Sequence, residues 1–173
     1  MVNVLVTGGN GQLANCIKSL IGSFEDYNFI FSSSNELDIT SEAQVNTFFS
    51  NHYIDWCINC AAFTADLAET EINQEQKINS EGPRNLAIAC AQNHVKLIHI
   101  STDFVFDGSK NEPYIEDDAT EPINIYGQTK LNGEREIQLN SDQYFIIRTS
   151  WLYSGFGHNF MKTMLGLAAK RNE

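Results

Sequence analysis

Residues Val2–Ala14, with the sequence VNVLVTGGNGQLA, decide the fold class of this chain. Val2–Val6 is a short apolar run typical of a β-strand, and it leads directly into a glycine-rich turn and a helical pattern. Gly9, Gly11 and Ala14 fit the spacing G-x-G-x-x-[G/A], in which small residues permit a tight turn and a close approach of the backbone to a pyrophosphate. The free N–H groups at the start of the helix would face those phosphates. We therefore predict a dinucleotide-binding turn, with a simple strand–turn–helix corner as the alternative.

Beyond this turn, apolar runs of strand type alternate with amphipathic helical patterns. Strands are expected at residues 2–6, 29–31, 56–60, 95–100 and 144–148, and helices at residues 11–22, 41–51, 73–93, 126–139 and 159–170. The helical stretch at 73–93 should break or bend near Gly82-Pro83, and residues 107–125 should form a loop. This order predicts an α/β fold: a Rossmann-type doubly wound parallel sheet with helices on both faces.

Composition limits the classes of partner. The 173 residues suit one domain, which we assign as an NAD(P)-binding domain over 1–173. With 22 acidic and 11 basic side chains the formal charge is −11, which disfavours nucleic acid and anionic membranes. No apolar run approaches the about 20 residues that span a bilayer, so we expect a cytoplasmic protein. Cys16, Cys57, Cys60 and Cys90 fall in expected helices and strands and are interpreted as buried structural thiols.

The end of the second strand bears on cofactor choice. An acidic residue usually holds the adenosine ribose here, but the sequence has Ser32-Ser33-Ser34. There is then no carboxylate to repel a 2′-phosphate and no arginine to bind one. We therefore expect both NADH and NADPH to be accepted.

Tyr126 and Lys130 form a YxxxK pair at the start of the helix that follows the long loop. Residues at i and i+4 share a helical face, so the lysine cation should lie beside the phenol and lower its pKa. Such a phenol can give a proton to a carbonyl that receives hydride. Thr102, at the end of the fourth strand, supplies the hydroxyl that makes this pair more specific.

Taken together, these motifs resemble the extended short-chain dehydrogenase/reductase superfamily and, within it, the dTDP-4-dehydrorhamnose reductase family. The matching stretches are TGGNGQLA (7–14), LDIT (37–40), INCAAFTA (58–65), INSEGPRNLA (78–87), STDFVFDG (101–108), EPINIYGQTKLNGE (121–134) and IIRTSWLYSGFGHNF (146–160). They cover nearly the whole chain in the expected order. STDFVFDG and the RTSW segment are far more specific than the glycine turn or YxxxK.

The resemblance implies a role for each matching residue. Thr102, Tyr126 and Lys130 would be catalytic, with Tyr126 as the proton donor. Asp103 and Trp151 would face the sugar substrate. Residues implied at the NADPH or NADH site are Gly8, Asn10, Gly11, Gln12, Leu13, Asp38, Ile39, Cys60, Ala61, Ala62, Thr64, Tyr126 and Lys130.

Several of these residues also have purely structural interpretations. Asp38 could be a turn or cap residue, Thr102 and Asp103 could cap the following loop, and Trp151 could belong to the core. His99 alternates into a buried strand and is interpreted as structural. Some family members bind a metal through an acidic residue early in the first helix; none is found over residues 15–17, so no metal is expected.

The leading hypothesis for function is an NAD(P)H-dependent reductase of a 4-keto sugar nucleotide, with dTDP-L-rhamnose, a precursor of cell-surface polysaccharide, as the product. A non-catalytic regulatory subunit and a sugar-nucleotide epimerase or dehydratase are the alternatives. Family enzymes continue past the last residue of this chain, so we expect a substrate-binding part to be missing. The surface where that part docks should be apolar and could self-associate into a homodimer.

Overall fold

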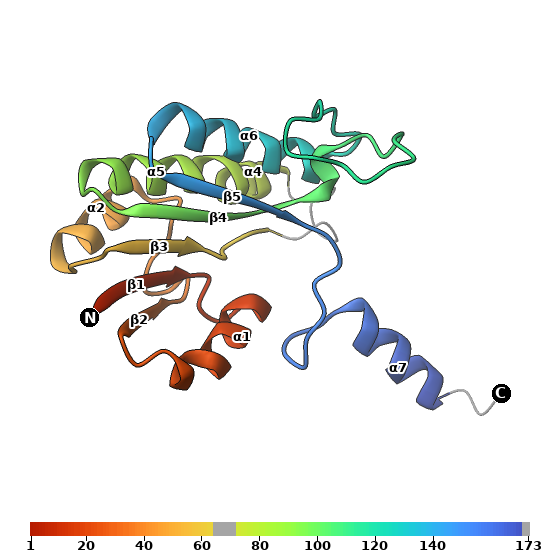
Figure 1. Ribbon diagram of the computed structural model, residues 1–173, viewed down its shortest axis with the longest axis horizontal. Helices are drawn as coiled ribbons and strands as arrows, with labels where there is room; N and C mark the ends of the chain where they lie inside the picture. The colour runs from red at the N-terminus through yellow and green to blue at the C-terminus, as the bar shows by residue number, and fades with distance from the viewer. Residues whose placement is uncertain (64–71, 171–173) are drawn as a thin grey trace.

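The computed structural model describes residues 1–63 and 72–170, and the five strands within them form a parallel sheet. The strand order is β2-β1-β3-β4-β5, so β1 lies inside the sheet although it begins the chain (Figure 1). The strands are β1 (Val2–Thr7), β2 (Tyr27–Ser32), β3 (Trp56–Asn59), β4 (Lys96–Thr102) and β5 (Tyr144–Thr149). All four neighbouring pairs are parallel, as the alternation of strands and helices predicts.

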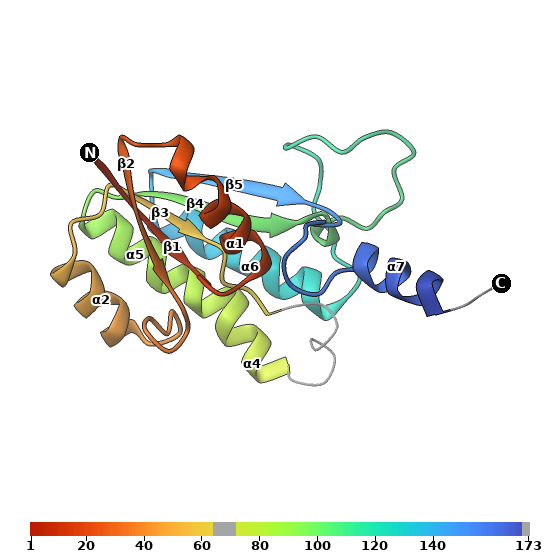
Figure 2. The ribbon, with the colours of Figure 1, turned by 90° about the horizontal axis from the view of Figure 1, so that it is seen from below.

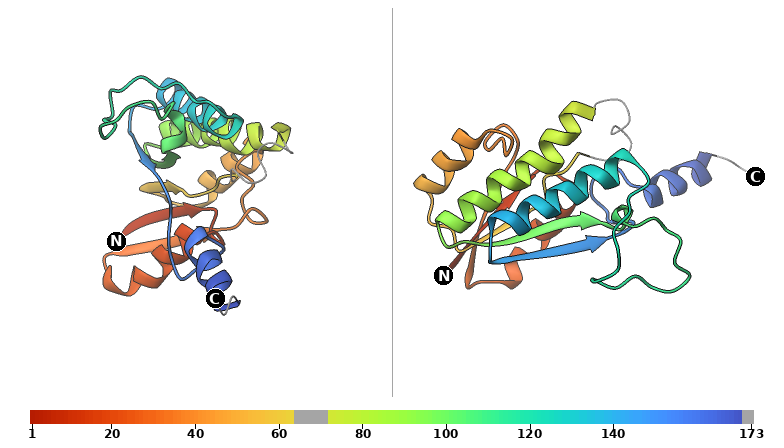
Figure 3. Two further views of the ribbon diagram at one scale, coloured as in Figure 1. Left: turned by 90° about the vertical axis from the view of Figure 1, so that its right-hand side faces the viewer. Right: turned by 90° about the horizontal axis from the view of Figure 1, so that it is seen from above.

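Helices cover both faces of the sheet, which confirms the predicted doubly wound fold. The helices are α1 (Gln12–Leu20), α2 (Glu42–Asn51), α4 (Ile72–Gln76), α5 (Gly82–Gln92), α6 (Ile125–Asn140) and α7 (Phe160–Lys170). Helix α1 lies on one face, in front of the strands in Figure 2, whereas α2, α5 and α6 lie on the other face, in front of the strands in the right-hand view of Figure 3.

The pleat of the strands sends alternate side chains into two cores. Leu5, Cys57 and Leu97 pack toward α5 and α6, where they are fully buried. Val4 and Val6 point the other way, toward α1. This period of two is the pattern expected of strands buried on both faces.

Part of the sheet face on the α1 side is apolar and accessible. A groove of about 290 Å³ runs across it and is lined by Val4, Phe24, Tyr27, Phe29, Trp56, Ile58 and Ile98. On the edge strand β5, Phe145 and Ile147 are exposed on this side, and Phe145 stacks on Trp56 with ring centroids 6.2 Å apart. Helix α7 projects beyond the carboxyl ends of the strands (Figure 1).

The helical stretch is irregular near Gly82-Pro83, as expected, but it is not broken there. Pro83 lies in the first turn of α5. The irregularity comes earlier, as a π-helical turn over Lys77–Glu81 that joins α4 to α5 without interruption. Within this turn the Asn79 side chain accepts from the Phe63 amide at 2.9 Å and donates to the Phe63 carbonyl at 3.2 Å.

Among the helices in the described ranges 1–63 and 72–170, none combines the length and the apolar character needed to cross a bilayer.

Candidate active site

The glycine turn packs directly against the chain that leaves β3. Gly8 has φ +65°, and a Cβ at this position would lie 2.7 Å from the Ala61 nitrogen, so only glycine fits. The Gly11 amide donates to the Gly8 carbonyl at 2.8 Å and closes the turn. Gly11 caps α1 without a side chain, so no side-chain oxygen takes up the first N–H groups of the helix. A tight cradle and an uncapped helix N-terminus together fit a pyrophosphate group.

The segment after β3 forms one wall beside this turn. Cys60 and Ala61 are partly buried and Ala62 is exposed. Burial raises the pKa of the Cys60 thiol to about 12, which makes it an inert lining group. Thr64, another residue implied at the cofactor site, lies outside the described residues.

Asp38 and Ile39 follow β2; local hydrogen bonds hold Asp38, whereas the core and a remote residue hold Ile39. The Asp38 carboxylate accepts from both the amide and the hydroxyl of Thr40, at 2.9 and 2.8 Å. Ile39 is buried in the core, and its carbonyl accepts from Asn85 Nδ2 at 3.0 Å. The turn-forming interpretation of Asp38 is therefore borne out, and contact of these residues with the adenine remains a prediction.

Sequence reasoning missed a carboxylate at the end of β2. Glu36 Oε2 accepts from the Ser33 amide at 2.8 Å and from the Ser33 hydroxyl at 2.7 Å. Hydrogen bonding to the Ser33 amide lowers the pKa of Glu36, so the group is charged at neutral pH. The spacing Ser33-x-x-Glu36 was the available signal, because a serine and a glutamate three residues apart commonly pair in this way.

The start of α6 lies against the end of β4. Asn124 caps the helix by accepting from the Gly127 amide at 2.7 Å. A Cβ on Gly127 would lie 2.1 Å from the Phe104 carbonyl oxygen, so the absence of a side chain permits this contact. The Tyr126 ring meets the Phe104 ring edge-on, with centroids 5.8 Å apart. This packing brings Tyr126 to Thr102, the last residue of β4.

The environment of the Tyr126 phenol differs from the expectation that Lys130 lowers its pKa. Burial raises the pKa of Tyr126, the hydrogen bond with the Thr102 hydroxyl lowers it in part, and the negative charges of Asp103 and Glu75 raise it. The expectation is therefore wrong for this structure. A phenol that keeps its proton is a competent donor to an oxygen that gains charge.

Lys130 is buried at 1% exposure and points into the sheet. Its Nζ donates to the Ile100 carbonyl at 2.7 Å and lies 3.4 Å from His99 Nε2. Burial lowers the pKa of Lys130 to about 8, against a smaller opposing effect of Glu134. The structure thus places all three expected catalytic residues in and around the end of β4.

The residues expected at the sugar lie at the same edge of the sheet. Asp103 accepts from the Thr102 hydroxyl at 3.2 Å. Trp151 has φ +49° and is 63% exposed, with its ring centroid 5.0 Å from that of Phe160, so it does not belong to the core. The segment that carries Trp151 reaches the glycine turn, because Gln12 Nε2 donates to the Leu152 carbonyl at 2.9 Å.

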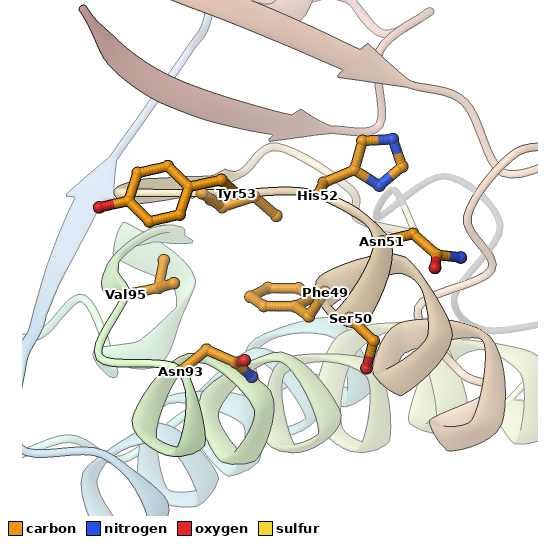
Figure 4. Close-up of a pocket in the computed structure, with 8 residues that line it drawn as sticks. Phe49, Ser50, Asn51, His52, Tyr53, Asn93 and Val95 are labelled. Carbon is orange, nitrogen blue, oxygen red and sulfur yellow. The ribbon is translucent and has the colours of Figure 1, made fainter.

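A separate pocket of about 320 Å³ lies at the opposite edge of the sheet (Figure 4). It is lined by Phe49, Ser50, Asn51, His52, Tyr53, Ile54, Asn93 and Val95. These residues precede β3 and β4, so they border the amino ends of the strands. Ligands of open α/β sheets bind at the carboxyl ends, and none of the expected site residues lines this pocket.

All four cysteines are free thiols. Cys57 and Cys90 are buried as expected, whereas Cys16 and Cys60 are only partly buried. The hydrogen bond of the Cys57 thiol to Cys90, together with burial, raises the pKa of Cys57 well above its ordinary value. Across residues 1–63 and 72–170, no three His, Cys, Asp or Glu side chains gather in a way that could hold a metal ion.

Comparisons with known proteins agree on one family. Residues 2–173 match the family described as RmlD substrate binding domain. The dTDP-4-dehydrorhamnose reductase of Aggregatibacter actinomycetemcomitans is 37% identical over 173 residues, which is 99% of this chain and 59% of that protein. The crystal structure of dTDP-4-dehydrorhamnose reductase from Bacillus anthracis in complex with NADP is 40% identical with a TM-score of 0.95, covering 99% of this chain and 61% of that one. The crystal structure of the reductase from Clostridium acetobutylicum is 40% identical in sequence, with a TM-score of 0.94, and it too covers 99% of this chain and 61% of its own. The chain therefore spans about three fifths of the length of these relatives.

Proposed function

The chain belongs to the RmlD substrate binding domain family, and from this premise we propose that it is the cofactor-binding part of an NAD(P)H-dependent reductase. The substrate would be a 4-keto sugar nucleotide, dTDP-4-dehydrorhamnose, and the product dTDP-L-rhamnose. The names of the relatives and the NADP bound to one of them support this proposal.

One observation carries the proposal at the level of chemistry. Thr102 and Tyr126 meet at the carboxyl edge of the sheet, on the same side as the glycine turn and its uncapped helix. A dinucleotide bound with its pyrophosphate at that turn could reach the tyrosine with its nicotinamide, because both features border the ends of neighbouring strands.

Each of the three catalytic residues would have a distinct task. Bound NADH or NADPH would supply the hydride to C4 of the sugar. Tyr126 would give its phenolic proton to the carbonyl oxygen, which becomes a hydroxyl. Thr102 would polarise that carbonyl and orient the phenol. The ammonium form of Lys130 would hydrogen-bond the nicotinamide ribose.

The remaining assignments are proposals on the same basis. Asp38 and Ile39 would border the adenine, the segment 60–62 would line the cofactor, and Asp103 and Trp151 would face the sugar. We also propose a cytoplasmic location, because the four cysteines are free thiols, as is usual in reducing compartments.

Replacement of the phenol tests the proposal. Tyr126→Phe in the full-length protein should lower kcat by about 10²- to 10⁴-fold while the Kd for NADPH stays within a few-fold. Tyr53→Phe is the matched control, since Tyr53 is exposed at the opposite edge of the sheet and should leave both values unchanged. Turnover by Tyr126→Phe at the normal rate would refute the proton-donor role. A full-length protein that binds cofactor but reduces no nucleotide sugar would favour the non-catalytic subunit.

A further inference from the structure

Three polar side chains form a row through the buried sheet. Thr7, Asn59 and His99 are register partners on β1, β3 and β4, and each is at most 1% exposed. They lie on the face that packs against α5 and α6. Polar groups in such a position need partners, because an unpaired buried polar group costs several kcal/mol.

The direction of the hydrogen bonds in this row is fixed by one backbone group. The Ala61 amide, which can only donate, reaches Asn59 Oδ1 at 3.1 Å, and the Thr7 hydroxyl donates to the same oxygen at 2.7 Å. The Asn59 amide therefore turns its Nδ2 donor toward His99 Nδ1, 3.0 Å away.

This arrangement determines where His99 carries its proton. Nδ1 must accept from Asn59, so it has no hydrogen, and the neutral ring bears its proton on Nε2. Complete burial and the neighbouring Lys130 both lower the pKa of His99, which keeps the ring neutral. The Nε2–H group is the atom that faces Lys130 Nζ, at 3.4 Å.

An N–H group that points at a lysine nitrogen favours the uncharged amine over the ammonium. An ammonium has three hydrogens and no lone pair, so it cannot accept this hydrogen, whereas an uncharged amine can. The Ile100 carbonyl accepts a hydrogen from either form at 2.7 Å. The uncharged amine of Lys130 thus has both an acceptor and a donor in place.

We propose that His99 is a positioning residue: its Nε2–H, fixed by Asn59, supports Lys130 as an uncharged amine and so makes the charge of this lysine switchable. The proposal rests on the proposed function for the catalytic meaning of Lys130. It assigns an active task to a histidine that the sequence alone suggested was only structural.

The surroundings of Lys130 include effects that raise its pKa and effects that lower it. Burial lowers the pKa of Lys130 most, while Glu134 on α6 and Cys60 after β3 raise it. The charge of Glu134 is itself balanced by Arg148 on β5, whose Nη2 lies 2.7 Å from the carboxylate. Tyr126, one turn earlier on α6, is a phenol that keeps its proton. The N–H of His99 and the burial of Lys130 therefore both favour the uncharged amine.

The tautomer is the first quantity to measure. In ¹⁵N-labelled protein, the side-chain nitrogen resonances of His99 should report a neutral ring protonated on Nε2 between pH 6 and 8. His99→Gln identifies the resonance among the four histidines. A ring protonated on Nδ1, or on both nitrogens, would overturn the proposal, and this result does not require any variant to be active.

The charge of Lys130 is the second quantity, followed by NMR of its side chain with Lys130→Arg as the assignment control. His99→Gln can turn its carboxamide oxygen toward Nζ, and Asn59→Asp forces the ring proton onto Nδ1 and leaves Nε2 as an acceptor. Both should raise the pKa of Lys130 by at least one unit. Thr7→Val is the matched control, because it removes a hydrogen bond of the row but leaves the Asn59 donor facing His99. An unchanged pKa of Lys130 in His99→Gln and Asn59→Asp would contradict the proposal.

Turnover gives a readout that separates this inference from the proposed function. If the ammonium of Lys130 is the active form, kcat falls as pH rises through the pKa of Lys130. His99→Gln should then keep its turnover to a higher pH, by the same shift as NMR records. A wild-type protein without reductase activity but with the expected tautomer and shifts would refute the function and leave the coupling of His99 to Lys130 intact.

Discussion

At the scale of single residues, the carboxylate of Glu36 bears on the cofactor preference of the proposed site. It is held by Ser33 just after β2, where the adenosine ribose binds in dinucleotide folds. A charge there favours a ribose with free hydroxyls over one with a 2′-phosphate. The absence of acids at 32–34 predicted that both NADH and NADPH are accepted; Glu36 gives a physical reason for a preference for NADH.

Glu36→Gln tests this effect, because glutamine retains an oxygen for Ser33 and loses the charge. We expect the affinity for NADPH relative to NADH to rise roughly two- to fivefold at low salt and less at high salt. Fluorescence titration with each cofactor measures it. Glu112→Gln, in the long exposed loop, is the control. If the affinity for NADPH relative to NADH were the same in Glu36→Gln and Glu112→Gln, Glu36 would not face the ribose.

At the scale of elements, the contact between α6 and the π-helical turn depends on Gly133. A Cβ there would lie 2.2 Å from the Asn79 carbonyl oxygen, so the helix and the turn touch through backbone. The same helix carries Tyr126 and Lys130, and its position therefore sets the geometry of the site.

Gly133→Ala should force α6 away from this turn and lower the free energy of unfolding by about 1–3 kcal/mol. Gly166→Ala is the matched control, because Gly166 lies in α7 with no heavy atom within 4 Å of the added Cβ. Alanine there should be neutral or stabilise α7 by up to about 1 kcal/mol. Urea unfolding of both variants gives the comparison; equal stability losses would mean that the Gly133 contact is not required.

Sequence patterns predicted most elements because apolar periodicity reflects burial, as Val4, Leu5 and Val6 illustrate. They did not predict the π-helical form of the turn over Lys77–Glu81, in which Asn79 pairs with Phe63 in a different segment. The candidate site also has features that the sequence predicts and features that it does not. The spacing of Gly9, Gly11 and Ala14 predicted the glycine turn, whereas the pKa of Tyr126 depends on burial, which spacing does not report.

At the scale of the whole molecule, stability should depend on pH through His99. The pKa of His99 is lowered well below 6.5 in the folded chain, so as pH falls below 6.5 the unfolded state binds a proton that the folded state does not. The free energy of unfolding should therefore decrease by up to about 1.4 kcal/mol per pH unit below pH 6.5.

Comparison with His99→Gln isolates this contribution. Urea unfolding at pH 7.0 and pH 5.5 should show a smaller loss of stability in the variant than in the wild type, because glutamine does not titrate. Equal losses in the two proteins would mean that His99 is protonated in the folded state, contrary to its burial.

The place of β1 inside the sheet also has a consequence in time. During synthesis Val4 leaves the ribosome 52 residues before Trp56, its register partner on β3. Until then β1 can pair only with β2, and one of its edges stays open. The second edge of β1 therefore stays unpaired until residues 56–59 are made, and its pairing with β3 is a long-range contact of the kind that slows folding.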